Sequence, residues 1–251
     1  MRQQVSDALV GLYDRLSRSG ILARPRARRA FESAYLAYKG LYEAGPVDGL
    51  RCLIPAGSTV IDVGANIGFF TLRFARWTGP SGRVVAIEPE ARNIASLRAR
   101  VESAGLSRTV ECIEAVAADR PGELRLALTP GHPGDHHLAN DGQPVRAVTL
   151  DGLVAGDPRA VSLIKIDVQG AEMLVLSGAR ELLATQRPAI HIEVDGPSLA
   201  RMGSSPRELI DSLVELGFRP RQLSRYGAGA AEDVDELVSH AWADYIDVLF
   251  R

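Results

Sequence analysis

Five short apolar runs stand out along the chain, and most end close to a glycine or an acidic residue. Between several of them, apolar residues recur at intervals of three and four positions. Short β-branched runs of this kind predict strands, whereas a period near 3.6 residues predicts amphipathic helices. The five runs read TVIDVG from residue 59, RVVAIEPE from 83, TVECIEAVA from 109, VSLIKIDVQG from 161 and AIHIEVDG from 189.

Helical patterns between these runs cover residues 69–77, 93–104 and 171–183. Strands that alternate with helices are typical of βαβ units, which build a parallel, doubly wound sheet. The runs are apolar on both faces, as expected for strands that helices cover from both sides. The sequence therefore predicts an α/β fold with a Rossmann-like sheet.

Two further pairs of apolar runs extend this pattern. ELRLALT (residues 123–129) and VRAVTL (145–150) flank an irregular insert, and we expect them to form an extra pair of strands. The insert holds three of the five histidines and is interpreted as a lid over the substrate. Near the end of the chain, FRPRQL and YIDVLFR predict a closing antiparallel hairpin.

The first 45 residues have a helical pattern rather than a strand pattern. Gly20 can end a first helix, and a second helix is predicted over residues 28–43. We therefore divide the chain into an N-terminal helical cap, residues 1–45, and a Rossmann-like domain, residues 46–251. Packing of the cap on that domain and a homodimer contact through these helices are both compatible with the pattern. The apolar positions of the first helix are Val5, Leu9, Leu12 and Leu16.

The composition is that of an ordinary globular protein, with 46% hydrophobic and 24% charged residues in a chain of 251. The net charge of −2 lacks the basic excess typical of nucleic-acid binding, so no nucleic-acid partner is expected. No run approaches the roughly 18 apolar residues of a membrane span, and no signal-peptide pattern is present, so a cytoplasmic location is expected. Cys52 and Cys112, the two cysteines, show neither metal-ligand nor disulfide spacing.

The loop that follows the first run has the residues of a nucleoside-binding site. Ligands of doubly wound sheets bind beyond the carboxyl ends of the strands. Asp62 lies at the end of the first predicted strand, Gly64 and Gly68 permit a tight loop, and Glu88 lies at the end of the next strand. A carboxylate at that second position can accept both ribose hydroxyl protons of an adenosine.

The same loop argues against a nicotinamide dinucleotide. The dinucleotide fingerprint G-x-G-x-x-G seats a pyrophosphate, and this loop has only GANIG, residues 64–68. The carboxylate of Asp62 would repel a pyrophosphate but suits the ammonium group of an amino acid. A ligand that joins adenosine to a cationic amino acid is S-adenosylmethionine, which this loop therefore predicts.

These motifs, in this order, resemble the FkbM family of S-adenosylmethionine-dependent methyltransferases. The resemblance spans roughly residues 41–196 and is specific because six stretches occur in sequence. It implies the class I methyltransferase fold and methylation of a hydroxyl oxygen on a sugar or a secondary metabolite. The six stretches are LYEAG, VIDVGANIGFFTL, VVAIEPE, TLDGLV, IKIDVQGAEMLVLSGA and HIEVDG.

The resemblance also implies a set of cofactor-binding residues. Tyr42 and Glu43 would cover the methionine end, and Ala115 and Val116 would offer backbone groups and an apolar wall to the adenine. Glutamate is common in the family at the position of Gln169, so this chain has one carboxylate fewer there. The remaining implied residues are Asp62, Gly64, Asn66, Gly68, Phe69 and Glu88.

Lys165 is one of only two lysines among 29 basic residues, and it lies inside the fourth apolar run. Because side chains alternate along a strand, Lys165 and Asp167 point to the same face. In a structural interpretation, the ammonium group neutralises Asp167 or Glu193 from below the site. In a functional interpretation, it fixes a carboxylate or holds the substrate oxygen.

Methyl transfer to a hydroxyl needs a group that helps to remove the acceptor's proton. Asp167 ends the fourth predicted strand, and His191, Glu193 and Asp195 alternate along the end of the fifth. Asp167, His191 or Glu193 would act as a general base, with Lys165 in support. Alternatively, Asp167, Glu193 and Asp195 would bind Mg²⁺, which lowers the pKa of a coordinated hydroxyl.

The sequence thus predicts a methyltransferase with a small-molecule acceptor, and two alternatives remain open. One is N-methylation of an amide or an amine on a peptide or a small molecule. The other is a non-catalytic module that binds the adenosine cofactor. Under that second alternative, an Asp167→Ala substitution would have no effect on any transfer.

Overall fold

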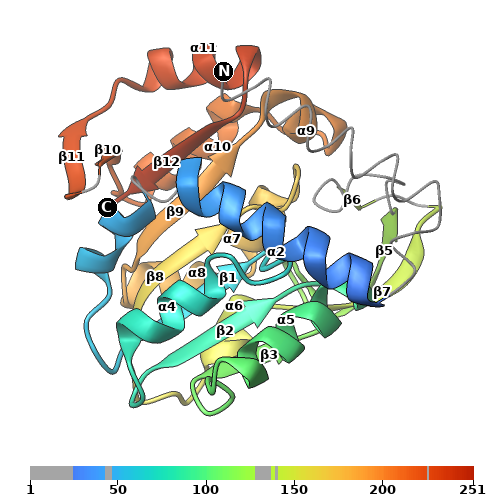
Figure 1. Cartoon of the computed structure of the whole chain (residues 1–251). Coiled ribbons are helices and arrows are strands. Elements are labelled where there is room, and N and C mark those ends of the chain that lie inside the picture. Colours follow the sequence, from blue (N-terminus) through green and yellow to red (C-terminus); the bar gives the residue numbers. More distant parts are fainter. Residues whose placement is uncertain (1–24, 43–46, 128–136, 139–140, 225) are drawn as a thin grey trace.

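A sheet of eight strands forms the centre of the computed structural model, which describes residues 25–42, 47–127, 137–138, 141–224 and 226–251 (Figure 1). The strands lie in the order β11-β10-β12-β9-β8-β1-β2-β3. The five strands from β9 to β3 are parallel, and β12 is antiparallel to β9. Their bounds are β1 Thr59–Val63, β2 Arg83–Ile87, β3 Val110–Ile113, β8 Val161–Ile166, β9 Ala189–Val194, β10 Pro220–Ser224, β11 Gly227–Ala231 and β12 Ile246–Phe250.

The chain changes direction across the sheet between β3 and β8. From β1 it runs outward through β2 and β3, and it then returns to β8 on the opposite side of β1. This reversal confirms the predicted doubly wound sheet and brings the carboxyl ends of β1 and β8 together, where ligands of such folds bind. The register pairs Asp62 with Lys165 and Lys165 with His191 across the three central strands.

The predicted pairing of FRPRQL with YIDVLFR is confirmed as the antiparallel contact of β10 with β12. The two strands do not form a simple hairpin, because β11 and α11 (Val234–Ala243) lie between them in the chain. β11 instead pairs with β10 at the edge of the sheet. The insertion of β12 beside β9 brings residues from the end of the chain next to the candidate site.

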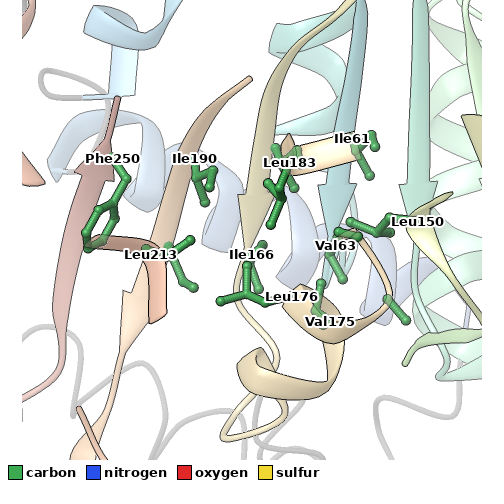
Figure 2. Close-up of a cluster of buried hydrophobic side chains, with 14 of the residues drawn as sticks. Ile61, Val63, Leu150, Ile166, Val175, Leu176, Leu183, Ile190, Leu213 and Phe250 are labelled. Atoms are coloured by element: carbon green, nitrogen blue, oxygen red, sulfur yellow. The ribbon is translucent and has the colours of Figure 1, made fainter. Parts of the chain in front are cut away.

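Helices cover both faces of the sheet, as the two-sided apolar strands predict. On one face, Ile61, Ile166 and Ile190 of the central strands pack with Leu183 of α8 and Leu213 of α10 (Figure 2). On the other face, η2, α4 and α5 supply the apolar cover. The bounds are η2 Gly49–Leu53, α4 Thr71–Thr78, α5 Ala91–Ser103, α6 Leu150–Val154, α7 Glu172–Ser177, α8 Arg180–Thr185, α9 Gly196–Arg201 and α10 Pro206–Glu215.

The prediction of a single helix over residues 171–183 is wrong, because the structure has two helices there, α7 and α8. The break falls at Gly178, where an added Cβ would lie 2.0 Å from the Ala118 carbonyl oxygen. The backbone therefore passes too close to a neighbouring segment for a side chain. Apolar periodicity carries no information on this long-range contact.

A smaller sheet of four strands lies beside the main one, in the order β4-β7-β5-β6. β5 and β7 are antiparallel, which confirms the extra strand pair predicted around the insert. Of the insert's histidines, His137 lies in β6, and His132 and His136 lie outside the described residues, so its role as a lid stays a prediction. The bounds are β4 Val116–Ala117, β5 Gly122–Ala127, β6 His137–Leu138 and β7 Gln143–Val148.

The second predicted N-terminal helix corresponds to α2, Pro25–Tyr42, and the first lies outside the described residues. α2, blue in Figure 1, runs past the ends of α4 and α5. Its Glu32 is buried and accepts hydrogen bonds from Ser96 and Arg100 of α5, so this helix packs against the main fold. In the part of the chain that the structure describes, no helix has both the length and the apolar character of a membrane span.

Candidate active site

The first strand ends in a buried carboxylate. Asp62 has no exposed surface, and the Thr71 hydroxyl at the start of α4 donates a hydrogen bond to its Oδ2 atom (2.5 Å). Burial raises the pKa of Asp62, while the nearby Lys165 ammonium acts in the opposite direction. The other oxygen, Oδ1, accepts no hydrogen bond from the described residues and lies 3.8 Å from Lys165 Nζ. Asp62 thus ties β1 to α4 and places negative charge below the loop.

The loop between β1 and α4 requires glycine where it approaches β8. Gly64 has a φ of +73°, and an added Cβ there would lie 1.9 Å from the Asp167 carbonyl oxygen. Gly68, with a φ of +95°, packs closely on Leu97. Asn66 also has a positive φ, +49°, a conformation in which asparagine is enriched among non-glycine residues. The loop therefore presents backbone rather than side chains to the end of β8.

Glu88, just beyond β2, is held by three N–H donors of the protein. The Asn66 N–H donates to Oε2 (2.9 Å), and the Glu90 N–H (3.0 Å) and the Asn93 side-chain amide (3.3 Å) donate to Oε1. A carboxylate has about four acceptor positions. This geometry leaves one of them, on Oε2, for a ribose hydroxyl, whereas two were expected from sequence. Burial raises the pKa of Glu88 to about 7.

The other residues implied for the cofactor lie around these two strand ends. Ala115 and Val116 are buried where β3 leads into β4, at the junction of the two sheets. Phe69 is buried directly after the glycine loop. Glu43 lies outside the described residues, and Tyr42 is described only as the last residue of α2. For these five residues, as for the loop residues and the two carboxylates described above, contact with the cofactor stays a prediction.

Lys165 lies between two carboxylates. Its side chain is only 3% exposed, and Nζ lies 3.1 Å from Asp167 Oδ2 and 3.8 Å from Asp62 Oδ1. Nζ also donates a hydrogen bond to the Gly64 carbonyl oxygen (3.0 Å). The pairing with Asp167 is one that the structural interpretation proposed, and Asp62 is a second partner that the sequence did not indicate. A compact ammonium group suits this enclosed position better than a planar guanidinium.

His191 lies beside Lys165 in the register of the sheet, one pleat below the end of β9. Its ring is buried, 6.0 Å from the Phe70 ring, and Nε2 lies 3.8 Å from Asp247 Oδ1. Burial lowers the pKa of His191, so the ring is neutral at neutral pH. At this depth the ring is less suited to contact an acceptor than the carboxylates nearer the strand ends.

Glu193, near the end of β9, is paired with Gln169. The Gln169 side-chain amide donates a hydrogen bond to Glu193 Oε1 (3.0 Å). Gln169 has a φ of +53°, and an added Cβ on the next residue, Gly170, would lie 2.3 Å from the Ser198 carbonyl oxygen. The turn after β8 is thus fixed against α9 and directs the amide at Glu193. A glutamate at position 169 would place a second carboxylate there instead of a donor.

The three carboxylates predicted to bind Mg²⁺ each have another partner. Asp167 and Glu193 have the partners described above, and Asp195 accepts a hydrogen bond from the Ser198 hydroxyl at the start of α9. Within the described residues, no group of three or more histidine, cysteine, aspartate or glutamate side chains is arranged to hold a metal ion. The Mg²⁺ site stays a prediction, which these pairings do not favour.

Two acidic residues near the site were not predicted from sequence. Glu172, in the first turn of α7, is 3% exposed and accepts a hydrogen bond from the Gly170 N–H (3.0 Å). Burial raises the pKa of Glu172 to about 7. Asp247 of β12 lies opposite Glu193 and near His191. A sequence signal for Glu172 did exist, because an acidic residue in the first turn is typical of the start of a helix. No such signal exists for Asp247, which reaches the site only because β12 pairs with β9.

A protein-family model described as the Methyltransferase FkbM domain matches residues 62–220. This range is more than half of the chain. It begins at Asp62 and contains the glycine loop, Glu88, Lys165, Asp167 and Glu193. Both the strand ends that form the candidate site and the helices between them therefore fall inside the match.

Two curated relatives match over part of their length. Methyltransferase 1 of Beauveria bassiana (strain ARSEF 2860) is 28% identical over 149 residues, which cover 49% of this chain and 59% of that protein. The AMB antimetabolite synthetase AmbE of Pseudomonas aeruginosa is 30% identical over 221 residues, which cover 68% of this chain and 10% of that protein. This chain therefore spans about three fifths of the first relative and a tenth of the second.

Solved structures of similar fold include two proteins of low sequence identity. Methyltransferase FkbM from Methylobacillus flagellatus KT is 19% identical, with a TM-score of 0.49, over 78% of this chain and 44% of that chain. Aeropyrum pernix fibrillarin with bound S-adenosyl-L-methionine is 15% identical, with a TM-score of 0.46, over 87% of this chain and 73% of that chain. Neither likeness bears on the acceptor.

Proposed function

This chain belongs to the FkbM methyltransferase family, and we propose that it transfers a methyl group from S-adenosylmethionine to a hydroxyl oxygen of a sugar or another secondary metabolite. The observation that carries the proposal is a pair of carboxylates, Asp167 and Glu193, at the ends of two neighbouring strands beside the switch point of the sheet. When bound, S-adenosylmethionine supplies a methyl group that its positively charged sulfur already activates.

The residues at the ends of β1 and β2 fit this cofactor. Asp62 Oδ1 is buried without a hydrogen bond from the described residues, and from beneath the loop its charge would attract the cationic amino-acid end of the ligand. Glu88 keeps an acceptor position for a ribose hydroxyl. The Asp62 carboxylate beside the loop would repel the phosphates of a dinucleotide. The backbone of Gly64, Asn66 and Gly68 would line the space between Asp62 and Glu88.

Asp167 and Glu193 are the groups best placed to meet the acceptor. Both are partly exposed, whereas Lys165 and His191 are buried one pleat deeper. In this proposal Glu193 takes the proton of the acceptor hydroxyl, and Asp167 orients the acceptor by accepting a hydrogen bond from it. Lys165 holds the Asp167 carboxylate in place, and neutral His191 packs beneath the strand ends.

Mg²⁺ offers a competing way to activate the acceptor. Within the described residues, no group of three or more histidine, cysteine, aspartate or glutamate side chains is arranged to hold such an ion. Proton removal by Glu193 needs no such group, and we therefore favour it. Transfer should survive excess EDTA, whereas transfer that EDTA abolishes and Mg²⁺ restores would favour the metal.

N-methylation of a peptide or a small molecule is a second candidate. The name of AmbE assigns that protein to the synthesis of an antimetabolite and does not identify a methylated atom. An amine or an amide is the second class of acceptor. A carboxylate base serves both kinds of acceptor, so the atom that receives the methyl group has to be identified by experiment.

The first test needs no acceptor and measures S-adenosylhomocysteine binding to the purified chain by titration calorimetry. Binding with a dissociation constant in the micromolar range is expected. NAD is the matched control ligand, and no binding of NAD is expected. A folded chain that binds NAD and not S-adenosylhomocysteine would contradict the proposed cofactor.

The second test identifies the acceptor. The chain is incubated with S-adenosylmethionine carrying a ¹³C-labelled methyl group and with a panel of monosaccharides, glycosides and peptide amides. Mass spectrometry then locates the label. Label on a hydroxyl oxygen supports the proposal, and label on nitrogen alone selects N-methylation. Cofactor binding without transfer to any acceptor class would favour the non-catalytic module.

A further inference from the structure

Glu32 is a buried carboxylate on α2, the helix that precedes the main sheet. Only 7% of the residue is exposed. The Ser96 hydroxyl donates to its Oε1 (2.9 Å), and the Arg100 guanidinium donates to its Oε2 (3.0 Å). Both donors belong to α5, so one side chain joins the two helices. A carboxylate is costly to bury without such donors, and this contact therefore fixes where α2 lies on α5.

The same face of α5 carries a donor group for Glu88. The Asn93 side-chain amide donates to Glu88 Oε1 (3.3 Å), and the Asn93 N–H donates to Glu90, which caps the helix (2.6 Å). Residues three positions apart are neighbours on a helix surface, so Asn93 and Ser96 lie together. The side chain that Glu32 contacts is therefore next to the side chain that orients the ribose carboxylate.

α2 also passes close to α4, the helix that follows the glycine loop. Near the end of α2, an added Cβ on Gly40 would lie 3.7 Å from Arg73 Nη2 on α4. The Arg73 guanidinium stacks over the Phe69 ring (4.0 Å to the centroid) and donates to the Phe69 carbonyl oxygen (3.0 Å). Phe69 directly follows Gly68, the last glycine of the loop. In Figure 1, α2 runs past the ends of α4 and α5.

We propose that Glu32 is a positioning residue for the cofactor, which couples the docking of α2 to the binding of S-adenosylmethionine. The proposal rests on the assignment of that cofactor to Glu88 and the glycine loop. α2 bridges α5, which orients Glu88, and α4, which follows the loop. The cofactor would contact both Glu88 and the glycine loop, and α2 packs beside the two helices that follow them. Both therefore restrict the motion of α4 relative to α5, so each reduces the conformational entropy that the other loses on binding.

This coupling is reciprocal by thermodynamic necessity. The free energy that docked α2 adds to cofactor binding equals the free energy that the bound cofactor adds to the docking of α2. A substitution of Glu32 should therefore weaken cofactor binding, although Glu32 contacts α5 and would not touch the cofactor. The bound cofactor should in turn protect the backbone of α2. A side chain that only stabilises the fold would produce neither effect.

The first measurement is S-adenosylhomocysteine affinity, determined by calorimetry on the full chain. Glu32→Ala should raise the dissociation constant roughly five- to thirtyfold, which lies within the usual range of coupling between sites. Glu32→Gln keeps an acceptor for Ser96 and should have a smaller effect. The matched control is Glu102→Ala, an exposed glutamate of α5, which should stay within about twofold of the wild type.

The second measurement is amide hydrogen exchange along α2. S-adenosylhomocysteine should slow exchange in α2 of the wild-type chain and have no such effect in Glu32→Ala. Circular dichroism and thermal unfolding establish that each variant is folded. Ser96→Ala removes one donor from the α5 side without changing α2, and it replaces Glu32→Ala if that variant does not fold.

Two results would overturn the proposal. One is a folded Glu32→Ala chain with the wild-type affinity for S-adenosylhomocysteine. The other is a wild-type α2 whose exchange does not respond to bound ligand. A wild-type chain that does not bind S-adenosylhomocysteine would remove the cofactor assignment and the coupling together, whereas equal binding by both chains removes the coupling alone.

Discussion

The two halves of the candidate site are built in different ways. The half proposed for S-adenosylmethionine, at the ends of β1 and β2, is called the cofactor half; it consists of backbone and buried carboxylates, with Glu88 held by three N–H donors. The half proposed for the acceptor, at the ends of β8 and β9, is called the acceptor half; it consists of side-chain pairs, Asp167 with Lys165 and Glu193 with Gln169. The first half is fixed by the path of the chain, and the second by the choice of side chains.

This difference determines what a substitution can change in each half. A loop that approaches a neighbouring strand through its backbone has no room for a side chain, so a substitution disturbs the fold and the ligand together. A hydrogen-bonded side-chain pair can be altered without moving either strand. The cofactor half should therefore lose stability and binding together, and the acceptor half should lose transfer alone.

The largest effect is expected for Gly64→Ala, which breaks the cofactor half. The added Cβ would lie 1.9 Å from the Asp167 carbonyl oxygen at a φ of +73°. Strain at positive φ and overpacking together should cost about 2–5 kcal/mol of unfolding free energy and abolish S-adenosylhomocysteine binding. Urea unfolding and calorimetry measure the two effects.

Gly79→Ala is the matched control, because Gly79 has a φ of +74° and nothing within 4 Å of an added Cβ. Gly79 has a ψ of −176°, in a backbone region that glycine alone adopts readily, so the substitution should cost about 1–3 kcal/mol of unfolding free energy and leave the ligand affinity unchanged. Equal losses of stability in the two variants would show that backbone strain, and not the contact with β8, is what the loop avoids.

The next effect is expected for Glu193→Gln, which tests the acceptor half. If Glu193 removes the acceptor proton, transfer should slow by about 10²- to 10⁴-fold, with S-adenosylhomocysteine affinity within about twofold of the wild type. The labelled-methyl assay and calorimetry measure these quantities. Glu215→Gln makes the same chemical change at an exposed position of α10 and should leave both unchanged. Normal transfer in Glu193→Gln would assign the base to Asp167 instead.

A smaller effect, with a defined pH dependence, is expected at Glu88. Its pKa is raised to about 7 by burial, so the carboxylate is increasingly protonated as the pH falls below 7. Protonation removes the charged acceptor of the ribose hydroxyl, so affinity should fall as the pH falls. For one group with this pKa, the dissociation constant of S-adenosylhomocysteine should rise about tenfold between pH 8 and pH 6. Calorimetry at the two pH values measures the change.

Glu88→Gln should bind weakly at both pH values, because an uncharged side chain loses the charge-assisted hydrogen bond. Glu114→Gln, at an exposed glutamate just beyond β3, should keep the pH dependence of the wild type. A wild-type affinity that does not change between pH 6 and pH 8 would mean that Glu88 does not meet the ligand as a carboxylate.

Local spacing predicted the arrangement of the residues at the ends of β1 and β2 better than that of the residues at the ends of β8 and β9, and the reason is the distance along the chain. A short loop fixes Asp62, Gly64 and Gly68 relative to one strand, so their spacing alone specifies their arrangement. Gln169 and Glu193 are 24 residues apart, and their hydrogen bond depends on a turn that α9 fixes. No local sequence pattern indicates which side chains of two strands will form a pair.

The order of strands limited the prediction in the same way. Alternating runs predict a parallel sheet, but they do not show that β12 inserts beside β9 and brings Asp247 near His191. The break between α7 and α8 at Gly178 also depends on a distant segment, which approaches the backbone there. Long-range packing therefore decided the details that periodicity could not supply.

The smallest effect is expected for Gln169→Glu, which makes the acceptor half chemically symmetrical without changing its shape. The amide of Gln169 donates to Glu193 at 3.0 Å, and a second carboxylate at that distance could not ionise independently. The two groups would share a proton, and the apparent pKa of the pair would be raised. The pH of half-maximal transfer should therefore move up by about one unit, with a maximal rate within about threefold of the wild type. Gln222→Glu adds the same charge at an exposed position of β10 and should leave the profile unchanged. Unchanged profiles in both variants would mean that Glu193 does not take the proton, since a neighbouring carboxylate must affect any base in contact with it.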